Sequence, residues 1–264
     1  IDIDPTSIRK NVEVDVPVVG DCKLALSGML DIAAGKMAHV DWRGDHEAWL
    51  ETVAQWKQSK PLGYIRNDHI KPQHVIEEVY ALTGGEAIIT TEVGQNQMWA
   101  AQFYPFTRPR TLLTSGGLGT MGYGFPASIG AQCAFPDKKV VAVAGDGSIQ
   151  MNIQELATVV QYRLPIKVII LNNRHLGMVR QWQELFYDRN YSFTNMEAQP
   201  DFVKLAEAYG AEGYRISRPE DLRPVLEAAL SSPNPAIVDV TVEREENVYP
   251  MVPAGAALDE MLLV

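Results

Sequence analysis

Two short polar motifs, Gly145-Asp146-Gly147-Ser148 and Asn172-Asn173, contain the residue types in this chain that are best suited to binding a metal ion. Each motif follows an apolar run, at 140–144 and at 168–171, that is typical of a buried strand. Residues 148–171 are enough for one helix and one strand, so the motifs would end neighbouring parallel strands. Ligands collect outside the carboxyl ends of such strands. The pattern therefore predicts a Mg²⁺ site of hard oxygen ligands that also holds a diphosphate.

Helical and strand patterns alternate around these motifs. We expect strands at 87–91, 111–113, 214–216 and 236–242, and helices at 72–82, 122–134, 175–187, 200–210 and 222–230. Short β-branched strands separated by helices indicate an α/β fold, a doubly wound and mostly parallel sheet with helices on both faces.

Residues 1–60 have a different character. Strand candidates at 1–3 and 16–19 are followed by a helix from Asp21 to about residue 34 and by a tryptophan-rich helix at 45–58. Trp49 and Trp56 have the spacing of core residues on that second helix. We expect 1–60 to be the tail of a second α/β domain plus a linker, and 61–264 to be the main domain. The strand-like start at Ile1 indicates part of a longer protein.

Composition restricts the possible partners. The net charge is −10, with 46% hydrophobic and 21% charged residues, as in ordinary globular proteins. An acidic chain without basic runs is a poor binder of nucleic acid or of an anionic membrane surface. No apolar run has the length of a membrane span, and there is no signal peptide. Cys22 and Cys133 are far apart in the sequence and are predicted to be reduced, buried thiols.

The motif pair resembles the signature of thiamine diphosphate enzymes, a Gly-Asp-Gly followed by Asn-Asn. Four further stretches, 93–102, 115–122, 175–183 and 250–255, are similar to the carboxyl-terminal part of the catalytic chains of the acetohydroxyacid synthase (acetolactate synthase) family. The resemblance covers the chain essentially from end to end. It implies condensation of pyruvate with pyruvate or 2-ketobutyrate, with loss of CO₂, in branched-chain amino acid synthesis.

The resemblance also implies three cofactors: thiamine diphosphate, Mg²⁺ and a structural FAD. Asp146 and Asn173 would ligate the metal through side-chain oxygens, and His175 through its backbone carbonyl. FAD would contact Asp2, Ile3, Asp21 and Cys22 in the tail of an FAD-binding middle domain. The thiamine cofactor would contact Val93, Gly94, Gln95, Asn96, Gly119, Thr120, Met121, Gly145, Asp146, Gly147, Ser148, Asn173, His175, Leu176, Gly177 and Met178.

The same resemblance implies a substrate channel lined by Met178, Val179, Trp182 and Ala254, with Trp182 favouring 2-ketobutyrate. Met121 would wedge beneath the cofactor and hold it bent. Asn96 stands where many relatives have histidine, and it cannot carry charge. The glutamate that activates the cofactor is expected on the amino-terminal domain of the neighbouring subunit. We therefore assign no catalytic residue here and expect this chain alone to be inactive.

The family implies a homodimer or homotetramer with the active site at the subunit interface, and it leaves open a small regulatory subunit. We expect a bacterial cytoplasm, with a plastid or mitochondrion as alternatives.

Other thiamine diphosphate enzymes of 2-keto acids remain open as alternative functions, namely a decarboxylase, pyruvate oxidase or glyoxylate carboligase. So does a non-catalytic assembly module. Residues 117–122 fit G-x-G-x-x-G, but no acidic residue ends a strand about 20 residues later, which disfavours a dinucleotide site.

Overall fold

The structure is a computed structural model that describes residues 1–37 and 39–263. It contains two compact units, Ile1–Leu62 and Gly63–Val264. The division falls two residues after the expected boundary at 60. The assignment of the first unit to an FAD-binding domain stays a prediction.

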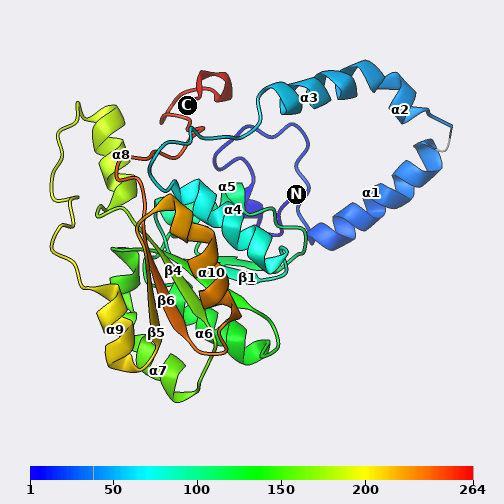
Figure 1. Ribbon diagram of the computed structural model, residues 1–264. Helices are drawn as coiled ribbons and strands as arrows, with labels where there is room; N and C mark the ends of the chain where they lie inside the picture. The colour runs from blue at the N-terminus through cyan, green and yellow to red at the C-terminus, as the bar shows by residue number, and fades with distance from the viewer. Residues whose placement is uncertain (38, 264) are drawn as a thin grey trace. The chain divides into compact units, whose positions relative to one another are not determined.

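The second unit is built on six parallel strands in the order β2-β1-β3-β4-β6-β5 (Figure 1). The strands are β1 (Ile88–Thr91), β2 (Leu112–Thr114), β3 (Val140–Gly145), β4 (Lys167–Asn172), β5 (Glu212–Ile216) and β6 (Ala236–Thr241). This confirms the predicted parallel α/β sheet. Gly145 pairs with Leu171, so the two polar motifs leave β3 and β4 at the same level of the sheet.

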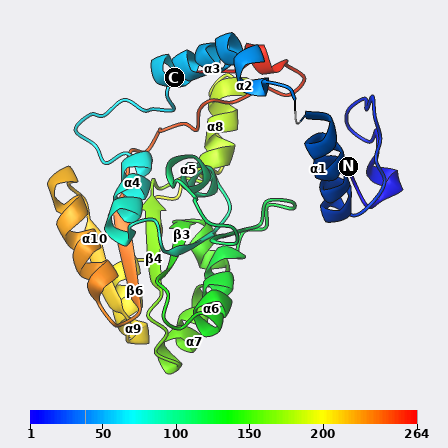
Figure 2. The ribbon, with the colours of Figure 1, turned by 90° about the vertical axis from the view of Figure 1, so that its right-hand side faces the viewer.

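Helices cover both faces of this sheet (Figure 2). One face carries α4 (Pro72–Thr83), α5 (Gln95–Phe103) and α10 (Leu222–Ser231). The other carries α6 (Gly124–Ala134), α7 (Leu156–Gln161) and α9 (Phe202–Tyr209). Successive side chains of β3 point to opposite faces of the sheet. Val141 and Val143 pack with the first layer of helices, and Ala142 and Ala144 pack with the second. The expected helices on both faces are therefore present.

Local signals account for where several helices begin and end. Pro72 is the first residue of α4, where its missing N–H costs no hydrogen bond. Gly84 ends that helix in the left-handed conformation, with φ of 60°. Asp201 caps α9 by accepting hydrogen bonds from the N–H groups of Val203 and Lys204. These ends agree with the predicted ranges within two residues.

The segment after Gly147 differs from the prediction. A continuous helix was expected there, but the chain forms two 3₁₀ turns, η2 (Ser148–Met151) and η3 (Ile153–Glu155), before α7 begins. Ser148 accounts for part of this, because its hydroxyl bonds back to the N–H and C=O of Gly145 and so tightens the turn. Other 3₁₀ turns are η1 (Pro5–Ser7), η4 (Pro219–Asp221) and η5 (Leu258–Glu260).

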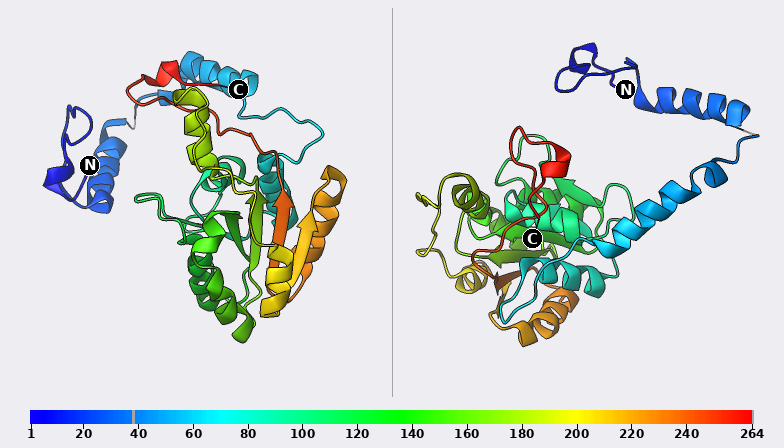
Figure 3. Two further views of the ribbon diagram at one scale, coloured as in Figure 1. Left: turned by 90° about the vertical axis from the view of Figure 1, so that its left-hand side faces the viewer. Right: turned by 90° about the horizontal axis from the view of Figure 1, so that it is seen from above.

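The order of the strands creates a crevice between β1 and β3. These neighbours are followed by helices on opposite faces, because α5 follows β1 onto one face and α7 follows β3 onto the other. At such a switch point the loops separate and leave room for a ligand. Helix α8 (Gly177–Phe186) stands beyond the carboxyl end of β4, as the left view of Figure 3 shows. The topology therefore places the polar motifs at a ligand-binding edge.

The first unit contains α1 (Cys22–Met37), α2 (Trp42–Asp45) and α3 (Glu47–Ser59). Its expected strands are reduced to one bridge between Asp2 and Val19. The expectation that Trp49 and Trp56 are core residues is wrong for this structure, because each is 57% exposed. Their rings pack edge to face on each other, with centroids 5.5 Å apart. None of the described residues of 1–62 is buried, so this unit has no core for them to enter.

Cys22 and Cys133 are both free thiols, but both are exposed, so the predicted burial is wrong. Both occupy helix positions that face away from any core, at the start of α1 and near the end of α6. Among the helices of residues 1–37 and 39–263, none is long and apolar enough to cross a membrane.

Candidate active site

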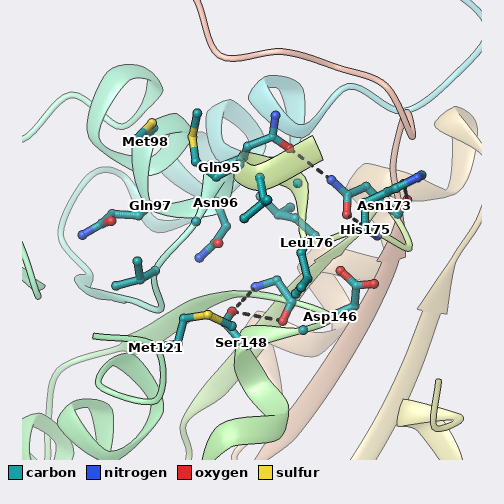
Figure 4. Close-up of a pocket in the computed structure, with 18 of the residues that line it drawn as sticks. Gln95, Asn96, Gln97, Met98, Met121, Asp146, Ser148, Asn173, His175 and Leu176 are labelled. Atoms are coloured by element: carbon teal, nitrogen blue, oxygen red, sulfur yellow. Dashed lines mark hydrogen bonds between the residues drawn. The ribbon is translucent and has the colours of Figure 1, made fainter. Parts of the chain in front are cut away.

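A pocket of about 390 Å³ lies at the carboxyl ends of the central strands (Figure 4). The starts of α5 and α8 and the turn η2 contribute to its wall. Its lining residues are Val93, Gly94, Gln95, Asn96, Gln97, Met98, Trp99, Gly119, Met121, Gly145, Asp146, Gly147, Ser148, Leu171, Asn173, His175, Leu176, Gly177, Met178, Val179 and Trp182. One cavity thus gathers residues from four separate stretches of the sequence.

Asp146 is the unusual side chain of this pocket. It is 0% exposed, and neither carboxylate oxygen has a hydrogen-bond partner. Burial, with a smaller contribution from the charge of Asp239, raises its pKa to about 7. The nearby backbone N–H groups of Gly147 and Arg174 lower this pKa only in part. A buried carboxylate without a well-aligned hydrogen bond or a counter-ion is costly. A divalent cation against its two free oxygens would remove that cost, so the residue fits a metal ligand.

The two asparagines of the second motif have different surroundings. Both ends of the Asn172 amide are hydrogen-bonded to other side chains. Its Nδ2 donates to Asp239 Oδ1 at 2.9 Å, and its Oδ1 accepts from Gln199 Nε2 at 3.0 Å. Asn173 lines the pocket. Its Nδ2 donates to Gln95 Oε1 at 3.2 Å, which directs Oδ1 away from Gln95. Of the pair, Asn173 is therefore the one that can offer an oxygen to a cation.

The turn after Asn173 is tight. Arg174 has a φ of 57°, in the left-handed region that side chains other than glycine rarely adopt. The N–H of His175 then donates to Asn173 Oδ1 at 3.0 Å, while its ring Nδ1 lies 3.0 Å from the Asn173 carbonyl. Burial lowers the pKa of His175, which favours the neutral ring. In the described residues, no three His, Cys, Asp or Glu side chains form a metal-binding cluster, so any cation here would rely on amide and backbone oxygens beside Asp146.

Backbone N–H groups dominate the anion-binding capacity of the pocket. The lining residues include no lysine or arginine. Helices α5 and α8 both begin at the pocket, and the first turn of a helix has unpaired N–H groups at its positive end. Gly94 precedes α5 with φ of 144°, a conformation that requires glycine. A diphosphate would thus be met by these N–H groups and by a cation at Asp146.

Asn96 acts as a brace at this corner. It is 4% exposed, and its Nδ2 donates to the carbonyl oxygens of Glu92 and Val143 at 3.0 and 3.2 Å. Glu92 directly follows β1 and Val143 lies within β3, so the side chain connects α5 to both strands. An uncharged amide suits this place, because it satisfies two buried carbonyls without bringing a charge into the core.

Glu92 is a functional candidate that sequence reasoning missed. It is 1% exposed, and its two carboxylate oxygens accept hydrogen bonds from the N–H groups of Gly122, at 2.6 Å, and Phe125, at 2.8 Å. Burial raises its pKa despite these bonds. Glu92 thereby caps the start of α6 and fixes the end of the loop that holds Met121. An acidic residue directly before the Val93 corner was the only signal for it in the sequence.

We predict that Glu92→Gln destabilises the chain by about 1–3 kcal/mol, because its amide nitrogen would face one of the two buried N–H donors. Denaturant unfolding measures this difference. Glu86→Gln is the control, since Glu86 forms an ion pair with Arg108 in which both side chains are about half exposed, and it should change stability by less than about 0.5 kcal/mol. Equal effects of the two substitutions would remove the capping role from Glu92.

Of the residues predicted to contact the thiamine cofactor or to line the channel, all but two line the pocket. Thr120 is exposed, and its backbone N–H donates to Ser115 Oγ at 3.0 Å. Ala254 is exposed in the tail between Met251 and Leu262, which pair with each other. Neither residue is among those that line the pocket, and their roles toward the cofactor and the channel stay predictions.

The structure adds residues that had not been predicted. Gln97, Met98 and Trp99 continue the first turn of α5 beyond the predicted corner, and Leu171 is the buried strand residue before the asparagine motif. On α8, the predicted channel residues Met178, Val179 and Trp182 all line the pocket. Trp182 is 47% exposed and forms its open, apolar rim.

The predicted FAD residues lie together in the first unit. The carbonyl of Asp2 accepts from the N–H of Gly20 at 3.0 Å, beside the bridge at Val19. Asp21 accepts from the N–H of Leu24 at 3.0 Å and thus caps α1, which begins at Cys22. Ile3 follows Asp2 and is 72% exposed. These contacts bring Asp2 and Asp21 to one end of α1, and their role toward FAD stays a prediction.

Comparison with known proteins gives a consistent result. Residues 92–240, more than half of the chain, match the family "Thiamine pyrophosphate enzyme, C-terminal TPP binding domain". The whole chain is 49% identical to acetolactate synthase isozyme 3 large subunit of Escherichia coli, covering 46% of that protein. The acetolactate synthase large subunit of Haemophilus influenzae is also 49% identical, with 46% of its length covered.

A plant relative extends the comparison. Acetolactate synthase 2, chloroplastic, of Zea mays is 44% identical over the whole of this chain, which covers 42% of that protein. The chain thus spans less than half of the length of these relatives. The matched family region includes both polar motifs and the start of α5, which build the pocket. The chain therefore belongs to the thiamine pyrophosphate enzyme family, of which it contains the C-terminal TPP-binding domain.

Proposed function

We propose that this chain is the carboxyl-terminal part of an acetolactate synthase large subunit, which condenses pyruvate with pyruvate or 2-ketobutyrate and releases CO₂. Asp146 carries the proposal, as a fully buried carboxylate without a hydrogen-bond partner in a pocket with two helix starts in its wall. Such a site fits a cation and a diphosphate bound together. The similarity of the whole of this chain to part of acetolactate synthase large subunits supports the choice of substrates.

In this proposal, Mg²⁺ is held by side-chain oxygens of Asp146 and Asn173 and by the carbonyl of His175. The backbone N–H groups at Gln95, Ser148 and the start of α8 hold the diphosphate. Thiamine diphosphate supplies an electron sink for the loss of CO₂ from a 2-keto acid. FAD, as a structural cofactor, would contact the end of α1 near Asp2 and Asp21.

The residues of this chain would then bind, orient and exclude water. Met121, from the loop fixed by Glu92, would support the cofactor from below, and Met178 and Trp182 would form the apolar wall of the substrate channel. No residue here takes the acid–base role. Glu155, a nearby acidic residue, accepts from Thr158 Oγ1 at 3.1 Å and is absent from the pocket lining among the described residues. We therefore assign that role to a glutamate of the amino-terminal domain of a neighbouring subunit.

The proposal includes an assembly and a location. A homodimer or homotetramer would form the complete active site between subunits, and a small regulatory subunit is a further candidate partner. Bacterial relatives at 49% identity favour the cytoplasm of a bacterium, and a chloroplastic relative at 44% makes a plastid the alternative.

The test is product analysis of the intact parent chain with pyruvate, thiamine diphosphate and Mg²⁺. Acetolactate is the expected product, and the isolated 264-residue chain should form none. Acetaldehyde without acetolactate would instead identify a decarboxylase. Failure of the intact chain to bind the cofactor would favour an assembly module.

We predict that Trp182→Leu in the intact chain lowers the preference for 2-ketobutyrate over pyruvate as second substrate by about 10-fold. The reason is that one apolar contact to the extra methylene is lost. The ratio of the two products in a mixed-substrate reaction measures this change. Tyr187→Leu is the control, because Tyr187 directly follows α8 and is not among the pocket residues. An unchanged ratio in the Trp182 variant would place the specificity elsewhere.

A further inference from the structure

A row of buried amide side chains begins at the C-terminal tail. The N–H of Val248 donates to Gln181 Oε1 at 2.9 Å, and Gln181 Nε2 donates to the carbonyl of Val248 at 3.0 Å. Gln181 lies on α8 and is 0% exposed. The donor and acceptor of a backbone are fixed, whereas an amide side chain can turn over and exchange its oxygen and nitrogen. Val248 therefore decides which end of the Gln181 side chain is the oxygen.

The orientation of the Gln181 amide fixes the orientation of the Gln95 amide, which lines the pocket. Gln95 Nε2 donates to Gln181 Oε1 at 2.8 Å and to the carbonyl of Glu246 at 2.9 Å. Only Oε1 of Gln95 is then left to face Asn173, whose Nδ2 donates to it at 3.2 Å, as the dashed line in Figure 4 shows. The amide of Asn173 is thus held with its oxygen directed away from Gln95. Reversal of any one of these amides would set donor against donor or acceptor against acceptor.

Gly177 leaves the space in which Gln95 and Asn173 meet. A Cβ at that position would lie 2.1 Å from Gln95 Oε1 and 2.8 Å from Asn173 Nδ2. Such distances are far below van der Waals contact, so any side chain at this position would separate the two amides. The hydrogen bond between them thus depends on a residue without a side chain at the start of α8.

We propose that Gln181 is a positioning residue for the metal site, which acts through Gln95 to present the oxygen of Asn173 to the cation. Gln181 is not among the residues that line the pocket, so its effect passes through Gln95. The inference rests on the proposed function, because it requires a metal ion between Asp146 and Asn173. The buried backbone of Val248 thereby sets the orientation of a metal ligand, Asn173, through two intervening amide side chains.

The experiment uses Gln181→Met in the intact parent chain, with Mn²⁺ as a paramagnetic substitute for Mg²⁺. Free Mn²⁺ is measured by electron paramagnetic resonance at a fixed concentration of thiamine diphosphate. We expect the Kd for Mn²⁺ to rise about 10–100-fold, as for other residues that orient metal ligands. We also expect kcat to recover at saturating metal, because the ligand is misoriented and not removed.

The matched control is Gln102→Met. Gln102 on α5 donates to the carbonyl of Tyr249 at 3.1 Å, so this variant loses a hydrogen bond to the same tail. Gln102 is not part of the relay, by which we mean the hydrogen-bonded series Val248, Gln181, Gln95 and Asn173. Its Kd for Mn²⁺ should stay within about 3-fold of wild type. The rescue variant is Gln181→Glu, whose buried and therefore neutral carboxyl group can accept with one oxygen and donate with the other. It should restore most of the metal affinity.

Three results would overturn the relay. The first is a Kd for Gln181→Met equal to that of Gln102→Met, and the second is a Glu variant that binds metal as poorly as the Met variant. If the Met variant does not fold, Gln181→Asn takes its place, since its amide is one methylene too short to reach Gln95. The third result is a wild-type chain that binds no Mn²⁺ with the cofactor, which would remove the metal site itself and the proposed function with it.

Discussion

Replacing Asp146 with asparagine should abolish Mg²⁺-dependent binding of thiamine diphosphate and, at the same time, stabilise the metal-free protein. Binding is lost because the pocket has no other carboxylate among its lining residues. We expect the cofactor Kd to rise at least 100-fold. Stability rises because the asparagine side chain would carry no charge, whereas the buried Asp146 carboxylate has no partner in the metal-free fold.

The pKa of Asp146 sets the pH range of this stability effect. Burial raises it from 3.8 in the unfolded chain to about 7 in the fold, so the folded state resists ionisation. A raised carboxyl pKa means that the metal-free wild type is most stable below its unfolded value and loses stability as the pH rises toward 7. The loss approaches an upper limit of about 4 kcal/mol. The asparagine variant should lack this dependence.

Denaturant unfolding of the metal-free protein at about pH 5 and about pH 8 compares the two, with calorimetric titration for cofactor binding. Asp137→Asn is the control, because Asp137 is exposed in the turn before β3 and should affect neither measurement. A variant of Asp146 that destabilises the metal-free protein, or that still binds the cofactor in a Mg²⁺-dependent way, would contradict this account of the site.

Gly124→Ala should be among the most damaging single-methyl substitutions in the second unit. A Cβ at the first residue of α6 would lie 2.3 Å from Glu92 N and 2.3 Å from Thr91 C, atoms of the backbone at the end of β1. Backbone of a central strand cannot yield as a flexible side chain would. We expect a loss of about 3 kcal/mol or more, seen as a fall in Tm of roughly 10 °C.

Gly130→Ala provides the matched control on the same helix. A Cβ at Gly130 would meet nothing within 4 Å, so the substitution brings only the better helix propensity of alanine. It should raise stability by about 0.5–1 kcal/mol. Thermal unfolding of both variants measures the contrast, and a mild effect of Gly124→Ala would show that α6 does not lie against β1 as closely as described.

Local chemistry made much of the second unit predictable from sequence. Asp201 and Gly210 act within a few residues of themselves, so the ends of α9 could be inferred without knowledge of the fold. The apolar runs before Gly145 and Asn172 predict buried parallel strands, and parallel pairing brings the two polar motifs to one edge. Asp146 and Asn173 were therefore predictable as neighbours, although they are 27 positions apart in the sequence.

Other features depend on what lies across space, which periodicity does not reveal. The spacing of Trp49 and Trp56 predicts one apolar helix face but does not reveal whether another element covers that face. Here no described residue of 1–62 covers it, and both side chains are exposed. Glu92 and Gln181 look like ordinary polar residues in the sequence. Their roles arise from the N–H of Gly122 and the backbone of Val248, which are 30 and 67 residues away.

The most direct test of the metal site is anomalous diffraction from crystals of the intact parent chain grown with Mn²⁺ and thiamine diphosphate. The account predicts one Mn²⁺ peak at the carboxyl ends of β3 and β4, bound by an oxygen of Asp146 and Oδ1 of Asn173. A Mn²⁺ ion bound elsewhere, or bound cofactor with Asp146 still free of any metal, would contradict it.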